Sequence, residues 1–221
     1  MNGFEKRAQQ KKQQILTATF TLMNTKTGVA DLTINAIATQ ANVSKATIFK
    51  YFGTKEQLIH EIFKQFIERL YREARALIAQ NKSFTETFIA LSQNKMRLLD
   101  TVKQQFYIDL MTYLTEKEDS ELSRLNQVYT AESLNLMLDL FHRGRKEGAV
   151  DLKYSDEFLM LYFDALIEGI SSPRIYERIR PYTAEWTEML LKGVAPNKAR
   201  KPTTDELALA ELKAAPPTEQ P

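Results

Sequence analysis

Residues Leu32–Leu58 read LTINAIATQANVSKATIFKYFGTKEQL and encode three short helices in succession. No acidic residue occurs between Leu32 and Lys55, so no carboxylate within that range opposes Lys45, Lys50 or Lys55. A compact helical segment with unopposed lysines is suited to contact phosphates. This segment is therefore the strongest indication of function in the chain.

Capping residues mark the first two helices. Thr33 can cap a helix whose apolar residues recur at the three-and-four spacing of one buried face, namely Ile34, Ile37, Ala38 and Ala41. Asn42 and Val43 then make a tight connection. Ser44 follows and offers a hydroxyl that can cap a second helix, Lys45–Phe52.

The end of the second helix is equally well marked. Ile48 and Phe52 lie four residues apart and can pack inward, which leaves a mainly polar outer face. Gly53 suits the left-handed position that ends a helix, and Thr54 with Gln57 forms a capping box that opens a third helix. Two short helices around a tight turn indicate a helix-turn-helix.

A helix-turn-helix predicts binding in the major groove of DNA, which admits a single α-helix. Lys45 and Thr47 begin the second helix, where base edges would be met. Lys50 and Tyr51 follow where the helix leaves the groove, so we expect them to contact phosphates. The alternative interpretation is that the lysines form only a solvated face. We favour DNA binding because capping, spacing and charge agree.

Thr33 and Lys55 are further candidates for phosphate binding. Both stand at the N-terminus of an expected helix. Free amide groups and the helix dipole favour an anion at such a position.

A set of residues between about Lys12 and Phe63 has the types and spacing of a known family. These residues are Phe20, Gly28, Thr33, Ile37, Ala38, Ala41, Val43, Ser44, Thr47, Phe49, Tyr51, Phe52, Lys55, Leu58 and Ile59. The segment resembles the N-terminal DNA-binding domain of the TetR family of bacterial repressors. The chain departs from the family where it has Asn42 in place of a frequent glycine, and where its recognition helix ends in Lys-Tyr-Phe.

The resemblance implies a role for each position of the motif. A first helix, here Lys6–Met23, would support the helix-turn-helix. The recognition helix would read bases with Lys45, Ala46, Thr47 and Phe49, while phosphates would be bound by Thr33, Lys50, Tyr51 and Lys55.

Charge and composition agree with this interpretation. Residues 1–64 carry nine Lys and Arg against four Asp and Glu, although the whole chain has a net charge of only +2. The absence of cysteine excludes disulfides and thiolate metal sites. No apolar run is long enough to span a membrane and the N-terminus is too polar for a secretory signal, so we expect a cytoplasmic protein without membrane contact.

The rest of the chain is helical in pattern, which predicts an all-α fold. Helices are expected from Lys55 to about Ala79, at Phe84–Leu99, at Gln104–Leu114, at about Glu118–Glu147, from Ser155 to about Ser172, and at about Tyr182–Leu191. We predict a helix-turn-helix domain at 1–54, a helical effector-binding and dimerisation domain at 55–194, and a mostly disordered tail at 195–221 with a possible short helix at 206–215.

The last two expected helices are rich in apolar side chains that a terminal hairpin cannot easily hide. These are Phe158, Leu161, Tyr162, Ala165, Ile170, Trp186, Met189 and Leu190. Ordinary core packing is the alternative. The stretch 145–169 also resembles the TetR family, which implies a homodimer built from these helices. A two-fold dimer predicts a near-palindromic double-stranded DNA operator.

Aromatic and methionine side chains are frequent in the middle of the expected second domain. They could line an apolar pocket for a small-molecule effector of unknown identity. The candidates are Met96, Phe106, Asp109, Tyr113, Tyr129, Met137, Phe141 and Tyr162. Such a stripe is more often core than pocket, so both interpretations stay open. The family resemblance implies that ligand entry shifts the dimer to a spacing that no longer fits the operator.

No catalytic motif, cofactor motif or metal site stands out. Glu56 and His60 lie one helical turn apart but lack a third ligand, and His142 is isolated in sequence. We therefore expect a ligand-responsive, DNA-binding repressor and not an enzyme. The alternative is a TetR-like interaction protein that acts through a protein partner.

Overall fold

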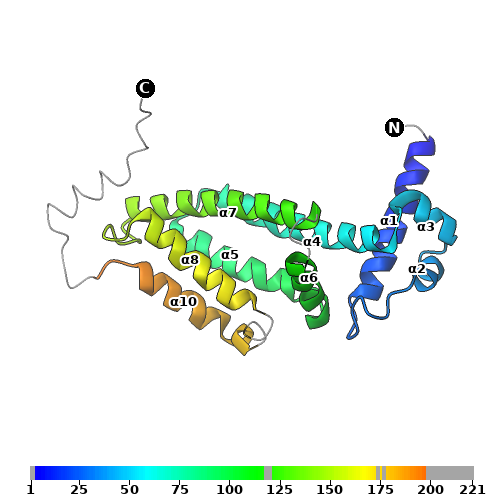
Figure 1. Ribbon diagram of the computed structural model, residues 1–221. Helices are drawn as coiled ribbons and strands as arrows, with labels where there is room; N and C mark the ends of the chain where they lie inside the picture. The colour runs from blue at the N-terminus through cyan, green and yellow to red at the C-terminus, as the bar shows by residue number, and fades with distance from the viewer. Residues whose placement is uncertain (1–2, 117–120, 173–174, 176–177, 198–221) are drawn as a thin grey trace, which may run out of the picture. The chain divides into compact units, whose positions relative to one another are not determined.

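The computed structural model of the protein describes residues 3–116, 121–172, 175 and 178–197, and all regular secondary structure in these ranges is helical (Figure 1). The all-α prediction is confirmed. The elements are α1 (Gly3–Met23), α2 (Ile34–Gln40), α3 (Lys45–Phe52), α4 (Lys55–Ile78), α5 (Phe84–Leu99), α6 (Gln104–Glu116), α7 (Glu121–Lys146), α8 (Asp156–Ser171), the 3₁₀ helix η1 (Arg180–Tyr182) and α10 (Thr183–Val194).

The predicted helix boundaries agree with the observed ones to within a few residues. The largest difference at a described C-terminus is in α10, which continues three residues beyond Leu191 to Val194. The expected beginning of α7 at Glu118 lies outside the described residues. So does most of the tail, including the short helix expected at 206–215.

The cap predictions in the helix-turn-helix are confirmed by hydrogen bonds. Thr33 Oγ1 accepts from the Ala36 N–H at 3.1 Å. At the capping box, Thr54 Oγ1 accepts from the Gln57 N–H at 3.0 Å, and Gln57 Oε1 accepts from the Thr54 N–H at 3.0 Å. These bonds satisfy amide groups that a helix N-terminus would otherwise leave unpaired.

The chain forms two compact units, which we call the first and second unit. Of the described residues, those within 3–71 and 98–129 belong to the first unit, and those within 72–97 and 130–197 belong to the second. The boundary proposed at 54/55 therefore falls inside the first unit. The reason is that α6 and the start of α7 pack with the N-terminal helices, although they are distant in sequence.

The first unit has a core centred on an aromatic cluster. The ring of Phe106, from α6, meets those of Phe20, Phe63 and Phe66 edge-on at centroid distances of 5.5, 5.2 and 5.4 Å. Phe63 and Phe106 are fully buried. Because a buried phenylalanine contributes about 1.5–3 kcal/mol, this cluster joins α6 firmly to α1 and α4.

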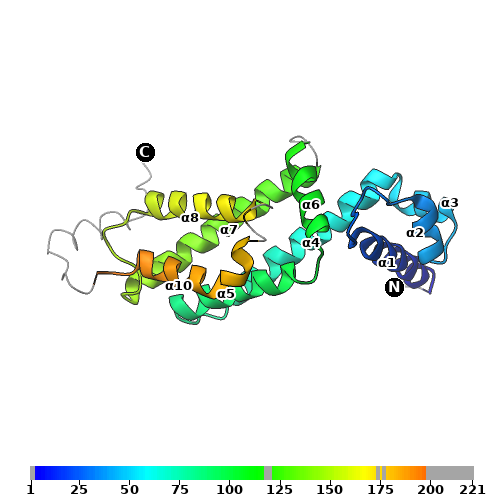
Figure 2. The ribbon, with the colours of Figure 1, turned by 90° about the horizontal axis from the view of Figure 1, so that it is seen from below.

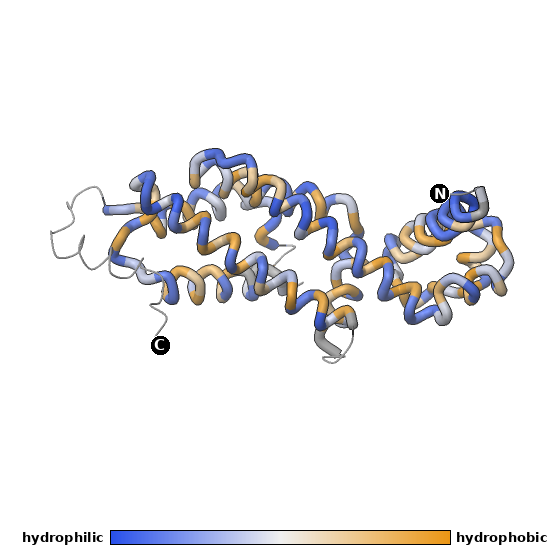
Figure 3. Tube along the Cα trace, turned by 90° about the horizontal axis from the view of Figure 1, so that it is seen from above, coloured by the Kyte–Doolittle hydropathy of each residue, from blue (hydrophilic) through white to orange (hydrophobic). Residues whose placement is uncertain are grey.

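The second unit has its own apolar core between α5, α7, α8 and α10 (Figure 2). Its buried residues are Phe84, Phe88, Met137, Leu140, Phe141, Val150, Leu159 and Val194. Hydrophobic and hydrophilic residues alternate along the long helices, as expected for amphipathic helices that bury one face (Figure 3). No helix in the described part of the chain is both long and apolar enough to cross a membrane.

Candidate nucleic-acid interface

The turn between α2 and α3 depends on an asparagine in a left-handed conformation. Asn42 has φ +51°, a region that asparagine tolerates better than most residues other than glycine. The Val43 N–H donates to the Ala38 carbonyl at 3.0 Å, which closes the turn. The departure from glycine at this position therefore preserves the tight turn of a helix-turn-helix.

A buried residue and a hydroxyl cap fix the orientation of α3. Ile48 is fully buried and anchors the inner face of the helix. Ser44 Oγ accepts from the Thr47 N–H at 3.2 Å and lies 2.9 Å from Thr47 Oγ1. The half-buried Thr47 side chain is thus held at the first turn of α3, where a base edge would be met.

The predicted base-reading face of α3 is open to solvent. Lys45 and Ala46 are exposed, and Phe49 keeps 46% of its surface accessible. Apolar contact with a thymine methyl group is one way in which DNA binding covers such a side chain.

Tyr51 lies between two lysines at the end of α3. Lys12 Nζ and Lys50 Nζ lie 5.7 and 6.0 Å from the centroid of its ring. Lys50 is exposed and Tyr51 is half-buried. The sequence interpretation did not include Lys12 of α1, although the pair Lys11–Lys12 would have been its signal. Lys12 is thus a second basic group beside this tyrosine.

The remaining two predicted phosphate contacts differ in their exposure and in the hydrogen bonds that they already make. Thr33 is exposed and its hydroxyl already caps α2. Lys55 is half-buried and its ammonium donates to the Leu32 carbonyl at 3.0 Å. This contact joins the start of α4 to the segment just before α2. Because an ammonium has three donors, Lys55 is still able to bind a phosphate.

Asp109 of α6 holds the turn that precedes α2. Its Oδ2 accepts from the Val29 N–H at 2.8 Å, and its Oδ1 accepts from Gln105 Nε2 at 2.8 Å. Gly28 has φ +58°, and a Cβ at this position would lie 2.0 Å from Asp109 Oδ2. The glycine that carries part of the family resemblance is therefore required for both its backbone conformation and its close approach to α6.

Asn24 makes a second connection between the end of α1 and the segment before α6. Its Nδ2 donates to the Thr101 carbonyl at 3.0 Å, and its Oδ1 accepts from the Lys103 N–H at 2.5 Å. Sequence reasoning missed both connections, because neither Asn24 nor Asp109 belongs to a local motif that includes its partner.

The eight predicted effector residues are divided between the two units. Phe106, Asp109, Tyr113 and Tyr129 belong to the first unit, and Met96, Met137, Phe141 and Tyr162 belong to the second. They therefore do not form one cluster inside either unit. Their role as ligand contacts stays a prediction.

Most of these eight residues have packing partners that explain their apolar character. Phe106 and Phe141 are core residues with at most 2% exposure, and Met137 is also buried. Tyr129 stacks on Tyr71 at a centroid distance of 4.6 Å. Tyr113 donates to Glu56 Oε2 at 3.3 Å, and Glu56 in turn lies 3.4 Å from His60.

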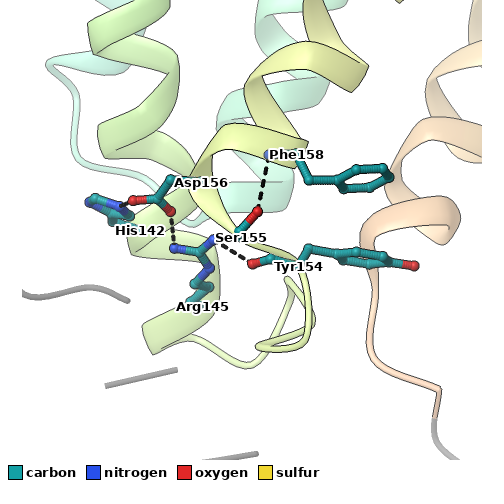
Figure 4. Close-up of polar contacts among 6 residues, drawn as sticks. All are labelled: His142, Arg145, Tyr154, Ser155, Asp156 and Phe158. Atoms are coloured by element: carbon teal, nitrogen blue, oxygen red, sulfur yellow. Dashed lines mark hydrogen bonds and ion pairs between the residues drawn. The ribbon is translucent and has the colours of Figure 1, made fainter. Parts of the chain in front are cut away.

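His142 belongs to an ionic cluster where α7 meets the start of α8 (Figure 4). Its Nε2 lies 2.8 Å from Asp156 Oδ2, and the other oxygen of Asp156 is bound by Arg145 Nη1. Arg145 Nη2 also donates to the Tyr154 carbonyl at 2.8 Å. Partial burial raises the pKa of Asp156, but the hydrogen bonds from His142 and Arg145 outweigh it and the pKa is lowered. These ion pairs and hydrogen bonds therefore join α7 to α8.

The predicted apolar surface of α8 and α10 is partly accessible. Phe158, Leu161 and Met189 keep 50%, 63% and 68% of their surface exposed. Ala165 is also exposed, whereas Tyr162, Trp186 and Leu190 are half-buried, and the side chain of Ile170 lies outside the description. Tyr154, just before α8, stacks on Phe158 at a centroid distance of 5.4 Å, and Phe158 stacks on Tyr162 at 6.2 Å.

The capped α2–turn–α3 unit, with an exposed and basic recognition helix, defines a helix-turn-helix DNA-binding protein. Residues 15–62 match the sequence pattern of the bacterial regulatory proteins of the tetR family. This part of the chain is therefore a DNA-binding domain of the TetR type.

Relatives agree with this assignment. The chain is 27% identical over 184 residues to the uncharacterized HTH-type transcriptional regulator YvaF of Bacillus subtilis strain 168, covering 72% of this chain and 95% of the relative. It is 24% identical over 139 residues to the HTH-type transcriptional repressor KstR2 of Rhodococcus jostii RHA1, covering 60% of this chain and 66% of the relative.

Solved structures share the fold. The transcriptional regulator FadR from Bacillus subtilis, in complex with stearoyl-CoA, aligns with a TM-score of 0.60 at 18% sequence identity. The alignment covers 83% of this chain and 99% of FadR. The helical body as well as the DNA-binding part therefore has the architecture of known transcriptional regulators.

Proposed function

We propose that the protein is a transcriptional repressor that binds a near-palindromic operator as a homodimer and is released from it by a small molecule. The observation that carries the proposal is the exposed outer face of α3, held in place by the buried Ile48 and the Ser44 cap. A helix presented in this way fits the major groove, and its first turn meets base edges.

The charge distribution around α3 supports DNA as the partner. Lys45 and Lys50 are exposed on α3 itself, and Lys12 reaches the same end of the helix through Tyr51. Lysines that neutralise phosphates release counterions, which supplies affinity that is independent of sequence. In the proposed complex, Lys45, Ala46, Thr47 and Phe49 read bases, and Thr33, Lys50, Tyr51 and Lys55 bind phosphates.

The exposed apolar residues of α8 and α10 support a dimer. Leu161 and Met189 are each more than 60% exposed and lie on the two helices at the end of the described chain. A second copy related by a two-fold axis would cover them with the same residues of its own. Two recognition helices would then meet half-sites about 34–36 Å apart, or somewhat further, on one face of the DNA.

Control by a small molecule is supported by the fold. FadR, which has the same architecture, was solved in complex with stearoyl-CoA. In the proposed mechanism the effector binds in the helical body and favours a conformation in which the recognition helices no longer fit the operator.

Binding to DNA from around the protein's own gene, measured at increasing salt, tests the proposal. A repressor should bind one fragment selectively, and the logarithm of the affinity should fall linearly with the logarithm of the salt concentration. An unrelated fragment of equal length is the control. Weak binding of equal strength to both fragments would contradict the proposal and favour a TetR-like interaction protein that acts through a protein partner.

A further inference from the structure

The outer face of α3 carries an apolar pair among its basic side chains. Ile48 is fully buried. Ala46 and Lys50, two residues before and after Ile48, lie on the opposite side of the helix because each residue turns it by about 100°. Ala46 and Phe49 are both exposed and, being three residues apart, are neighbours on the helix surface. The surface of α3 that is free to enter a groove is therefore partly apolar.

The two aromatic side chains at the end of α3 that lie nearest to its basic residues differ in their surroundings. Tyr51 is half-buried, and Lys12 and Lys50 lie beside its ring. Phe49 keeps 46% of its surface exposed, and among the described residues no aromatic ring stacks on it and no cation lies over it. The ring of Phe49 is therefore available to a partner outside the chain.

The position of Phe49 on α3 directs its ring to bases in the proposed complex. Phe49 follows Lys45, the first residue of the helix, by one helical turn, so the two lie on the same side. Ala46, next to the ring, contributes only a methyl group, which lets DNA approach the helix closely at this level. Because the N-terminal part of a recognition helix contacts base edges, the ring would meet the floor of the major groove.

The chemistry of the ring restricts which base can satisfy it. A phenyl ring has no hydrogen-bond donor or acceptor. All four bases present polar atoms in the major groove, and thymine alone adds a methyl group, at C5. Covering a polar base edge with a phenyl ring removes water without replacing its hydrogen bond, whereas covering a methyl group removes apolar surface from water.

We propose that Phe49 selects thymine at one pair of symmetry-related operator positions by contact with the C5 methyl group. The feature that is recognised is a 5-methylpyrimidine. At this position 5-methylcytosine should therefore bind better than cytosine, although the two have the same hydrogen-bonding groups. This inference rests on the proposed function, because it names a chemical feature of the operator that the repressor reads.

Removal of the methyl group alone tests the contact. The full-length protein first selects its preferred sequence from a pool of random double-stranded DNA. Each thymine is then replaced by deoxyuridine, in both half-sites at once, so that only the C5 methyl groups are lost. We expect the dissociation constant to rise about tenfold at one position or more, because each half-site loses the burial of one methyl group. A similar ratio is expected there between cytosine and 5-methylcytosine.

Variants of Phe49 assign the effect to its ring. Phe49→Ala should bind the thymine operator and the deoxyuridine operator within about twofold of each other, whereas Phe49→Leu, which stays apolar, should keep part of the preference. Lys50→Ala, an exposed change on the same face of α3, is the matched control. It should bind both operators more weakly and keep the ratio of the natural protein. Thermal unfolding of each variant shows that it is folded.

Two results would overturn the inference and leave the repressor proposal intact. One is selective binding to an operator whose affinity depends on no thymine methyl group. The other is a Phe49→Ala variant that keeps the full preference for thymine over deoxyuridine, since another residue would then read the methyl group. If the pool yields no preferred sequence, the protein does not read DNA, and the repressor proposal and this inference fail together.

Discussion

Asp109 Oδ2 accepts a hydrogen bond from the Val29 N–H at 2.8 Å and so joins α6 to the turn before the helix-turn-helix. The two residues are 80 positions apart in sequence. Asp109 has 9% of its surface exposed, so the bond is largely shielded from water. Any movement of α6 must therefore either carry the turn at Gly28 and Val29 with it or break a buried, charge-assisted hydrogen bond.

Removing this carboxylate should loosen the support of the helix-turn-helix. We expect Asp109→Ala to lower the free energy of unfolding by about 1–3 kcal/mol, because the Val29 N–H loses its acceptor. Asp109→Asn should have a smaller effect, since an amide keeps one of the two acceptor oxygens. Thermal denaturation measures both. Asp139→Ala, which changes an exposed aspartate of α7, is the control and should leave the unfolding curve unchanged.

Substitution of Gly28 is an independent test of the close contact between this turn and α6. Gly28→Ala would strain a backbone with φ +58° and place a methyl group against Asp109. We expect a loss of unfolding free energy of about 1–3 kcal/mol. Gly3→Ala, where a Cβ meets nothing within 4 Å, is the matched control. Full stability of Gly28→Ala would show that the turn is not held against α6.

Two substitutions in α3 separate base reading from phosphate binding. Lys50→Ala should weaken binding to every DNA sequence by a similar factor and reduce the salt slope by about one. Thr47→Ala should change the preferred sequence, with an effect of about 1–3 kcal/mol at one operator position. Thr47→Ser is its control, because it keeps the hydroxyl that meets Ser44. A uniform loss of affinity in both alanine variants would contradict the division of roles.

The helices and their caps could be predicted from sequence because their signals are local. Thr33, Ser44 and the pair Thr54 and Gln57 each act within three residues, and the structure contains each predicted bond. The left-handed turn at Asn42 is local as well. Interactions between residues that are close in sequence therefore determine the helix ends and the turn of the DNA-binding site.

The connections between distant segments could not be predicted in the same way. Asp109 is an effector candidate because it could supply polarity to an apolar pocket, and sequence alone did not indicate that its carboxylate accepts from the Val29 N–H. A sequence shows that a buried carboxylate needs a donor but does not say which one.

A charge placed on the exposed apolar residues should disrupt the proposed dimer. We expect Leu161→Glu or Met189→Glu to raise the dimer dissociation constant about tenfold or more, because a carboxylate would be buried in an apolar interface. Sedimentation velocity over a range of concentrations measures the change. Val128→Glu, at an exposed position of α7, is the control. Unchanged association of both glutamate variants would place the interface elsewhere.

The ionic cluster of His142, Arg145 and Asp156 should make the free energy of unfolding depend on pH in the acidic range. Because the pKa of Asp156 is lowered in the folded protein, its ionised form contributes stability above its unfolded value of about 3.9, and this contribution is lost as pH falls through the folded-state pKa. Asp156→Asn should therefore cost about 1–2 kcal/mol at pH 7, since His142 and Arg145 lose a charged acceptor that is only partly exposed. The difference between the natural protein and the variant should shrink steadily as acid is added. Asp164→Asn, an exposed change on the same helix, should show no such convergence. The free energies of unfolding of the natural protein and of Asp156→Asn could instead differ by a constant amount down to the acid transition. The ionised carboxylate would then contribute nothing to joining α7 and α8.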